Sequence, residues 1–286
     1  MGAGEAGSVF LAGAVAGVCE GVTVQPMEMV KTRFQINTGA QMRILPTMRA
    51  IIQEGGVRQL YRGGLPEIAG LVPRSSAMWS SYEFSRRTMV AWNGGVCTTP
   101  IVAAAGACAG VCEGMAFSPF QVVKVRLMAK EHLGRYQNTL DCLRQIVRTE
   151  GIAALTIGLG PTLWRNCVWD SIYLSCMHNV DLHVPKPDSV PLAVLQNGML
   201  GTAAGMFATC FNAPFDVCKS RFQAQLPGAP NPYTSTFGAL RRILAEEGLR
   251  GIYKGLAPKA LRLGVGQTVG LTVFQALVPA EASAQR

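Results

Sequence analysis

Apolar residues gather in six long segments of the chain. Three stretches of more polar character lie within the first, second and third pairs of these segments. The pattern predicts long helices near residues 8–36, 64–92, 100–129, 158–182, 192–222 and 255–279. Each is long enough to cross a bilayer, which takes about 20 residues of α-helix. The polar stretches 37–63, 130–157 and 223–254 carry short amphipathic helices, for example from Leu45 to Gln53.

Charged residues interrupt the long apolar segments. Glu20, Glu113, Arg165 and Arg262 each fall inside a predicted helix. A charge within a membrane helix is costly unless it faces the bundle interior or water. We therefore predict an all-α membrane protein whose six helices surround a water-filled cavity.

The chain repeats one unit three times. Prolines 93 and 95 residues apart open similar phrases, which read PMEMVKTR from Pro26, PFQVVKVR from Pro119 and PFDVCKSR from Pro214. Rows of small residues precede the phrases: Gly13, Gly17, Gly21; Gly106, Gly110, Gly114; Gly201, Gly205. Such rows let neighbouring membrane helices approach closely. Glu-Gly pairs follow at Glu54, Glu150 and Glu247. We place the repeats at 1–95, 96–189 and 190–286.

Composition supports a membrane protein over a soluble enzyme. Of the 286 residues, 49% are hydrophobic and 15% are charged, and the mean hydropathy is +0.24; a soluble domain has about 25% charged residues. The net charge of +9 suits nucleic acid, anionic lipid or an anionic solute. No exposed basic stripe or zinc-finger spacing supports nucleic acid, so lipid and solute remain.

Motifs for catalysis and for cofactors are missing from the sequence. The chain has no Ser/His/Asp or Cys/His constellation, no P-loop and no dinucleotide-binding glycine motif. Its nine cysteines and three histidines do not fall at metal-ligand spacing. We predict that the protein is not an enzyme and has neither a metal nor a cofactor.

The triple phrase Pro-x-[Asp/Glu]-x-x-[Lys/Arg]-x-[Lys/Arg], with Glu-Gly following in each copy and Tyr-[Arg/Lys]-Gly in two, resembles the mitochondrial carrier family over nearly the whole chain. The resemblance implies six transmembrane helices in a threefold pseudosymmetric barrel and three short amphipathic helices on the matrix side. It also implies transport through one central site and multi-pass placement in the mitochondrial inner membrane.

The same resemblance assigns the phrases to a gate on the matrix side. Each proline is expected to kink its helix so that the C-terminal part leans toward the barrel axis. By family analogy the gate consists of Glu28, Lys31, Gln121, Lys124, Asp216 and Lys219. The acid of one phrase pairs with the base of the next, which gives Glu28–Lys124 and Asp216–Lys31. Because Gln121 replaces an acid, it can only hydrogen-bond Lys219. Gln35 and Gln223 occupy the positions of the bracing glutamines.

The gate on the cytosolic side is expected to be weak. The family motif [Phe/Tyr]-[Asp/Glu]-x-x-[Lys/Arg] is complete at Tyr82, Glu83 and Arg86. The copy from Met177 to Asp181 has an acid in place of the base, and the copy from Phe274 to Val278 has no charge. We therefore expect the cavity to open preferentially on this side.

Symmetry predicts the substrate contacts. Arg165 and Arg262 lie 15 residues after the second and third Glu-Gly acids, and Gly70 is the first-repeat equivalent. Guanidinium groups bind carboxylates in bidentate fashion and stay charged. Arg165 followed by Asn166 resembles carriers of carboxylates and keto acids, and the 2-oxodicarboxylate carriers resemble the chain most. In the mechanism we expect, a dianion bridges Arg165 and Arg262, Asn166 hydrogen-bonds its oxygen, and Arg74 supplies the missing first-repeat contact.

Glu20 and Glu113 lie six residues before two of the kink prolines. A carboxylate near the cavity can couple a proton to the anion, or it can balance the arginines when the site is empty; we favour charge balance.

The resemblance also implies cardiolipin at the starts of the even-numbered helices, and we expect a monomer. Two alternatives remain open: a citrate or other tricarboxylate exchanger, and a non-transporting carrier-like receptor or adaptor.

Overall fold

The computed structural model describes residues 3–36, 43–185, 190–224 and 235–277, and its regular elements there are all helices. The long ones are α1 (Ala3–Ile36), α3 (Gly64–Trp92), α4 (Thr99–Met128), α6 (Leu159–His183), α7 (Val190–Gln223) and α9 (Leu256–Leu277). The short ones are α2 (Ile44–Gly55), α5 (Thr139–Glu150) and α8 (Thr236–Ile252). This confirms the predicted helices. Three single 3₁₀ turns, η1 (Val57–Tyr61), η2 (Lys130–His132) and η3 (Ile152–Thr156), were not predicted.

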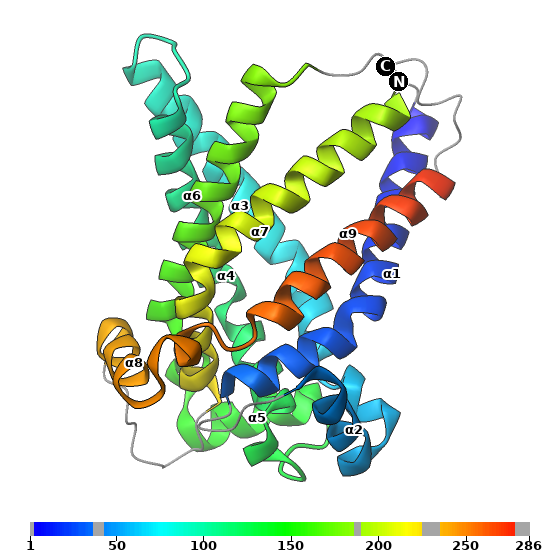
Figure 1. Ribbon diagram of the computed structural model, residues 1–286, viewed down its shortest axis with the longest axis vertical. Helices are drawn as coiled ribbons and strands as arrows, with labels where there is room; N and C mark the ends of the chain where they lie inside the picture. The colour runs from blue at the N-terminus through cyan, green and yellow to red at the C-terminus, as the bar shows by residue number, and fades with distance from the viewer. Residues whose placement is uncertain (1–2, 37–42, 186–189, 225–234, 278–286) are drawn as a thin grey trace.

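The six long helices form one bundle around an axis. Neighbours in the chain pack on each other, from α3 on α4 through α4 on α6, α6 on α7 and α7 on α9, and α9 packs on α1. Figure 1 shows the three short helices together at one end of the bundle, here called the short-helix end. The long helices diverge toward the opposite end (Figure 1). The bundle is therefore tightest beside the short helices.

Three equivalent apolar clusters seat the short helices. Each cluster combines the last turns of α1, α4 or α7 with the short helix that follows it or with the turn after that short helix. The clusters contain Met29, Val30, Phe34, Ile51 and Leu60; Val122, Val123, Leu127, Cys142 and Ile146; and Val217, Cys218, Phe222, Ala239 and Ile243. Burial raises the pKa of the Cys142 thiol to about 12. The apolar faces of α5 and α8 are thus covered within their own repeats, whereas the cluster that covers α2 also contains Met128 of α4.

A second threefold feature joins one repeat to the next. Gly63, Gly158 and Gly255 have positive φ of 86°, 76° and 85° and precede α3, α6 and α9. A Cβ at Gly63 would lie 3.2 Å from the carbonyl oxygen of Lys124, and the equivalent distances from Gly158 to Lys219 and from Gly255 to Lys31 are 3.5 and 3.4 Å. Glycine is favoured at these positions by its conformation and by the close approach.

The second base of each phrase is anchored by the Glu-Gly acid of the same repeat. Arg33 pairs with Glu54 at 2.8 Å and Arg221 with Glu247 at 2.8 Å, and Arg126 makes the equivalent pair with Glu150. Burial opposes ionisation of Glu247, but a hydrogen bond from Lys254 and the charge of Arg221 hold the pKa of its carboxyl below the usual value. These pairs tie each long helix to its short helix.

The predicted glycine rows differ in what they pack against. A Cβ at Gly110 would lie 2.6 Å from the backbone of Asn166 and Cys167, so α4 and α6 touch through their backbones. Gly17 and Gly21 of α1 have open space within 4 Å, so our interpretation of the first row as a packing surface is wrong there. Gly13 lies outside the residues whose side-chain positions the structure describes.

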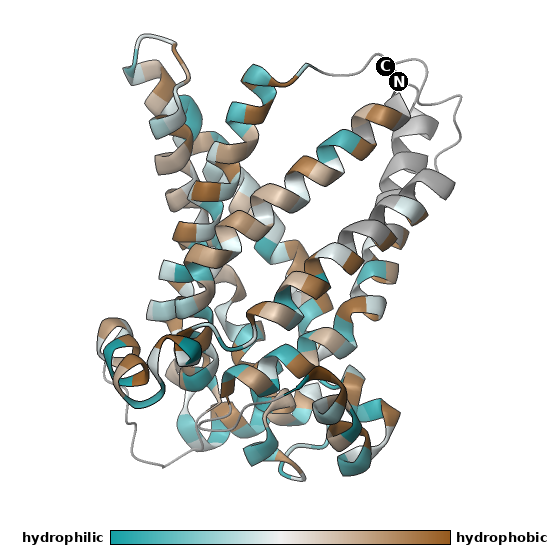
Figure 2. Cartoon of the chain, viewed as in Figure 1, coloured by the Kyte–Doolittle hydropathy of each residue, from teal (hydrophilic) through white to brown (hydrophobic). Residues whose placement is uncertain are grey.

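The outer surface is apolar although most long helices are mixed in character. On α7 the exposed large apolar side chains are Leu192, Leu195, Met199, Met206, Phe207 and Phe211. Among the described residues, α4 alone is long and apolar enough to cross a membrane on length and composition. Figure 2 shows polar and apolar residues interspersed along the other long helices. This mixture is what a bundle with a polar interior and an apolar exterior requires.

Substituting Gly110 by alanine tests the close approach of α4 and α6. The added methyl group must displace the α6 backbone, so we expect a loss of about 1–3 kcal/mol in the free energy of unfolding. The measurement is the thermal unfolding temperature of the purified protein in detergent. Gly17→Ala is the matched control, because space is open there and alanine favours helix by up to about 1 kcal/mol. Equal unfolding temperatures for the two variants would contradict this packing.

Candidate functional site

A charged cavity of about 320 Å³ lies inside the bundle, and all six long helices contribute side chains to it. The basic residues lining it are Lys31, Arg74, Lys124, Arg165, Lys219, Lys259 and Arg262. The acidic ones are Glu20, Glu28, Glu67, Glu113, Asp170 and Asp216. Acids and bases nearly balance, so the individual pairs decide which cations remain available.

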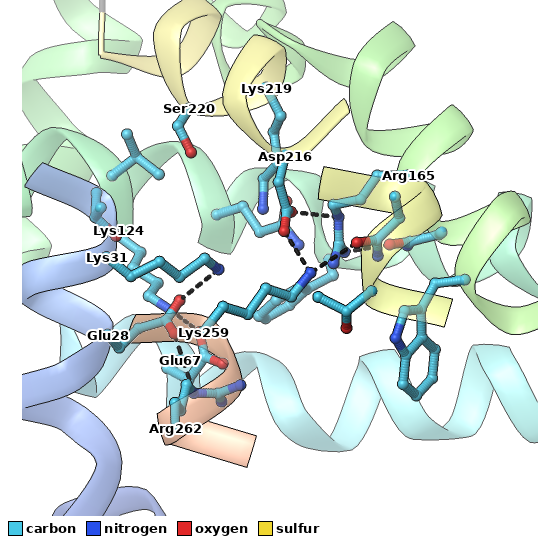
Figure 3. A pocket seen from close by; sticks show the side chains of 18 of the residues that line it. Glu28, Lys31, Glu67, Lys124, Arg165, Asp216, Lys219, Ser220, Lys259 and Arg262 are labelled. Carbon is cyan, nitrogen blue, oxygen red and sulfur yellow. Dashed lines mark hydrogen bonds and ion pairs between the residues drawn. The ribbon is translucent and has the colours of Figure 1, made fainter. Parts of the chain in front are cut away.

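Glu28 is the centre of one ion-pair network at the short-helix end (Figure 3). Its carboxylate lies 3.0 Å from the ammonium of Lys124 and 3.4 Å from that of Lys31. Its second oxygen lies 3.0 Å from Nε of Arg262. The predicted Glu28–Lys124 pair is therefore present, and it joins α1 to α4. Lys124 also donates to Glu67 of α3 at 2.6 Å.

A second network surrounds Asp216 of α7 (Figure 3). Lys259 of α9 donates to Asp216 at 2.5 Å and to the side-chain oxygen of Asn212 at 2.8 Å. Nε of Arg165 lies 3.7 Å from the other oxygen of Asp216. The expected Asp216–Lys31 pair is absent among the ion pairs of the described residues, because Lys259 occupies Asp216 and Glu28 holds Lys31.

The third expected contact, between Gln121 and Lys219, is not formed either. The side-chain oxygen of Gln121 is buried without a hydrogen-bond partner. Within the described part of the chain, the Lys219 ammonium has no hydrogen bond and no ion pair within 4 Å. The gate is thus asymmetric, with ion pairs around two acids and none where glutamine replaces the third.

The two expected braces lie beneath this gate and differ in their contacts. Gln35 accepts a hydrogen bond from Ser220 at 2.7 Å, and its backbone oxygen accepts one from Arg221 at 3.2 Å. Gln223 is fully buried and has neither side-chain oxygen nor nitrogen hydrogen-bonded among the described residues. A Cβ at Gly158 would lie 2.9 Å from its Cγ. Gln223 therefore fills space, whereas Gln35 links α1 to α7.

Two of the expected substrate contacts are engaged elsewhere. A Cβ at Gly70 would lie 2.2 Å from the Phe117 ring, and it is the neighbouring Leu71 that lines the cavity. Arg74 donates to Glu113 at 2.5 Å and lies over Phe117 with 5.2 Å between the guanidinium carbon and the ring centre. The expectation that Gly70 faces the substrate does not fit its contact with this aromatic ring.

Arg165 and Arg262 both line the cavity, and each keeps hydrogen-bonding capacity. Arg165 donates to the side-chain oxygen of Asn166, which fixes the orientation of that carboxamide. Nε of Arg165 and Nε of Arg262 are both buried without a hydrogen-bond partner, although each lies near an acid. Their ion pairs are therefore Coulombic contacts without aligned hydrogen bonds, which an incoming carboxylate can replace.

Glu20 and Glu113 have different surroundings. Both line the cavity. Glu113 is buried and accepts a hydrogen bond from Arg74. A Cβ at Gly266 would lie 2.8 Å from a carboxylate oxygen of Glu20, so α9 passes close to this acid.

The residues of the expected cytosolic gate pair within one helix. Arg86 and Glu83 of α3 lie 3.0 Å apart, Arg87 binds the same acid at 2.6 Å, and Arg86 lies 6.0 Å from the Tyr82 ring centre. The copy from Phe274 to Val278 lies outside the residues whose side chains the structure describes. Thus Glu83 does not bridge helices in this conformation.

Glu67 and Lys259 are the two ion-pair residues that the pattern could have identified. Each lies four residues after a left-handed glycine, directly after a proline, at Gly63-Gly64-Leu65-Pro66-Glu67 and Gly255-Leu256-Ala257-Pro258-Lys259. The second copy has Thr162 at that position. The available signal was a charged residue at this position in two repeats, an acid in the first and a base in the third. Asp170, buried with one oxygen unpaired, carried no such repeat signal.

Comparison with known proteins places these features in a family. The sequence profile described as mitochondrial carrier protein matches residues 3–91, 97–187 and 190–279. A probable mitochondrial 2-oxodicarboxylate carrier of Dictyostelium discoideum is 34% identical over 92% of this chain and 87% of that protein.

Two further relatives are also similar over most of both chains. The mitochondrial 2-oxodicarboxylate carrier of Homo sapiens is 33% identical over 95% of this chain and 93% of its own length. The mitochondrial citrate transporter D of Aspergillus niger is 34% identical over 94% and 92%. The chain belongs to the mitochondrial carrier protein family, whose members are multi-pass transporters of the mitochondrial inner membrane.

Proposed function

We propose that the chain exchanges 2-oxodicarboxylates, of the 2-oxoadipate and 2-oxoglutarate type, by alternating access through the central cavity. The observation that carries the proposal is Arg165. Its guanidinium lines the cavity, its nearest acid is 3.7 Å away, and its Nε has no hydrogen-bond partner. A substrate carboxylate can supply the aligned bonds that Asp216 does not. Relatives that carry the name 2-oxodicarboxylate carrier support the substrate class.

Arg262 connects substrate binding to the gate. It lies 3.0 Å from Glu28, the acid that also holds Lys31 and Lys124. A carboxylate that takes Arg262 removes one of the charges stabilising Glu28. Binding then weakens the closed matrix gate, because a ligand shifts a two-state equilibrium only by its differential affinity for the two states. Release on the other side and return with a counter-substrate complete the exchange.

Citrate exchange is the second candidate. It is favoured by the similarity to the citrate transporter. A tricarboxylate would require a third cation in the cavity. Arg74, the cation expected for this role, is held by Glu113 at 2.5 Å, which weighs against citrate by that route. A carrier-like receptor or adaptor that transports nothing is the remaining alternative.

The other roles follow from the same proposal. Transport by this route forms no covalent bond, so we propose a carrier without catalytic activity, metal or cofactor.

Cardiolipin is proposed at the start of α3, where Arg58, Tyr61 and Arg62 line a surface pocket, since backbone amides at a helix start bind phosphate. Glu20 and Glu113 are proposed to balance charge, and the carrier to act as a monomer.

Exchange by the purified protein in liposomes tests the function. Liposomes loaded with 2-oxoglutarate are given labelled 2-oxoglutarate, 2-oxoadipate, malate, citrate, ATP or aspartate. We expect the 2-oxodicarboxylates to exchange fastest. Faster exchange of citrate selects the second candidate, and exchange of ATP or aspartate alone contradicts both. A folded protein that exchanges nothing supports the receptor.

Arg165→Met should lower 2-oxoglutarate exchange by about 10–100-fold, because a hydrogen bond to a charged group contributes about 1.5–3 kcal/mol. Arg87→Met is the matched control. The Arg87 side chain is 77% exposed and binds Glu83 of its own helix, so this variant should exchange at the wild-type rate. Wild-type exchange by Arg165→Met would exclude the proposed site.

Glu28→Gln should lower the unfolding temperature by roughly 6–10 °C. The change leaves Lys31, Lys124 and Arg262 without their shared anion, and breaking a buried ion pair costs about 3 kcal/mol or more. Glu83→Gln removes an acid of similar type from an exposed pair within α3 and should alter the unfolding temperature little. If the two variants unfold at the same temperature, Glu28 is not the centre of the network.

A further inference from the structure

We infer that Lys219 is a second anion anchor of the closed-gate conformation, and that it binds the distal carboxylate of the proposed dianionic substrate. The inference rests on the proposed function and adds a specificity-determining residue to it. Family resemblance assigns Lys219 to the gate, where its partner would be the residue at position 121. In this chain that residue is neutral.

The first observation is that Lys219 forms no ion pair within 4 Å among the described residues. Lys219 lines the cavity, and among the described residues no acid lies within 4 Å of its ammonium. Asp216, one turn earlier on α7, is occupied by Lys259 at 2.5 Å and lies 3.7 Å from Arg165. Gln121 offers only an amide oxygen, which is buried without a partner. A half-buried cation in this position attracts an anion from the cavity.

The second observation is a row of polar residues on α7 that line the cavity, two of which have an atom without a hydrogen-bond partner. Thr209, Asn212, Asp216 and Lys219 all line the cavity. Asn212 is fully buried, and Lys259 donates to its side-chain oxygen at 2.8 Å, which leaves the amide nitrogen as its unsatisfied end. The hydroxyl of Thr209 is also buried and unpaired. These groups offer hydrogen bonds to an anion beside α7.

Spacing along α7 fits a dicarboxylate. Arg165 reaches α7 at the level of Asp216, and Lys219 lies three residues further on. Three residues of α-helix rise about 4.5 Å, so the two cations are offset by about one turn. A chain with a carboxylate at each end can therefore contact Arg165 with one end and Lys219 with the other. A 2-oxo monocarboxylate reaches Arg165 alone.

This arrangement also orders the steps of binding. Arg262 already lies 3.0 Å from the Glu28 carboxylate, whereas Lys219 has no ion pair within 4 Å among the described residues. An incoming carboxylate can therefore bind Lys219 without displacing an acid. The distal carboxylate binds Lys219 first and takes the place of the acid missing from the gate. Transfer of that carboxylate to Arg262 then loosens Glu28. Lys219 should thus determine affinity, and Arg262 should determine turnover.

Gln121→Glu and Gln53→Glu together test the inference. The first variant restores the acid that the gate lacks at position 121, whereas the second adds the same charge at an exposed position of α2 that does not line the cavity. Thermal stabilisation of each purified protein is measured with succinate, glutarate, adipate, 2-oxoglutarate, 2-oxoadipate and the monocarboxylate 2-oxobutyrate. For Gln121→Glu we expect a higher unfolding temperature without ligand and dianion binding about tenfold weaker or more. Gln53→Glu should bind the dianions as the wild type does.

Lys219→Met provides a second variant that does not add charge. It should lose affinity for dianions about tenfold while 2-oxobutyrate binding stays unchanged, and its KM for exchange should rise with kcat retained. Dianion binding by Gln121→Glu and Lys219→Met equal to wild type would overturn the inference.

The outcomes separate this inference from the proposed function. If only other dianions stabilise the wild type and Gln121→Glu weakens their binding, the role of Lys219 stands and the 2-oxodicarboxylate assignment falls. If 2-oxodicarboxylates are exchanged and both variants bind them normally, the role of Lys219 falls alone. If no dianion stabilises the wild type, both fall.

Discussion

The Glu28 carboxylate is the interaction on which the closed conformation depends. One buried acid is shared by Lys31 of its own helix, Lys124 of α4 and Arg262 of α9. Burying a charge is unfavourable unless it is paired and hydrogen-bonded, so these helices are held together as long as Glu28 keeps its partners. The gate and the proposed substrate site share Arg262, which makes binding and opening parts of one equilibrium.

The threefold sequence repeat does not produce threefold electrostatics. Backbone features follow the symmetry closely: the left-handed glycines Gly63, Gly158 and Gly255 and the pairs of Arg33, Arg126 and Arg221 with their Glu-Gly acids recur in every repeat. The residues facing the cavity differ, with Gln121 at an acid position and Lys259 opposite Asp216. The repeat therefore builds the barrel, and the departures from it supply the chemistry for an asymmetric anion.

The fold could be predicted from the sequence because each of its determinants is local and repeated. Apolar segments, prolines and glycines placed all six long helices and the three short ones. The Glu28–Lys124 pair also followed, since both residues belong to the repeated phrase. The Asp216–Lys31 pair did not form, because a competing cation, Lys259, comes from a helix start that the phrase does not include. Side-chain competition of this kind depends on distances in space, which spacing along the chain does not supply. The contacts of Gly70 and Arg74 with Phe117 escaped prediction for the same reason.

The central claim is that the substrate competes with Glu28 for Arg262, and the affinity of the Glu28→Gln variant tests it most directly. Without the acid, Arg262 is available before the ligand arrives. Isothermal titration of the purified variant with 2-oxoglutarate should give a lower Kd than the wild type, while its exchange in liposomes becomes slower. An unchanged or higher Kd would contradict the account, because it would mean that Glu28 and the substrate do not share this cation.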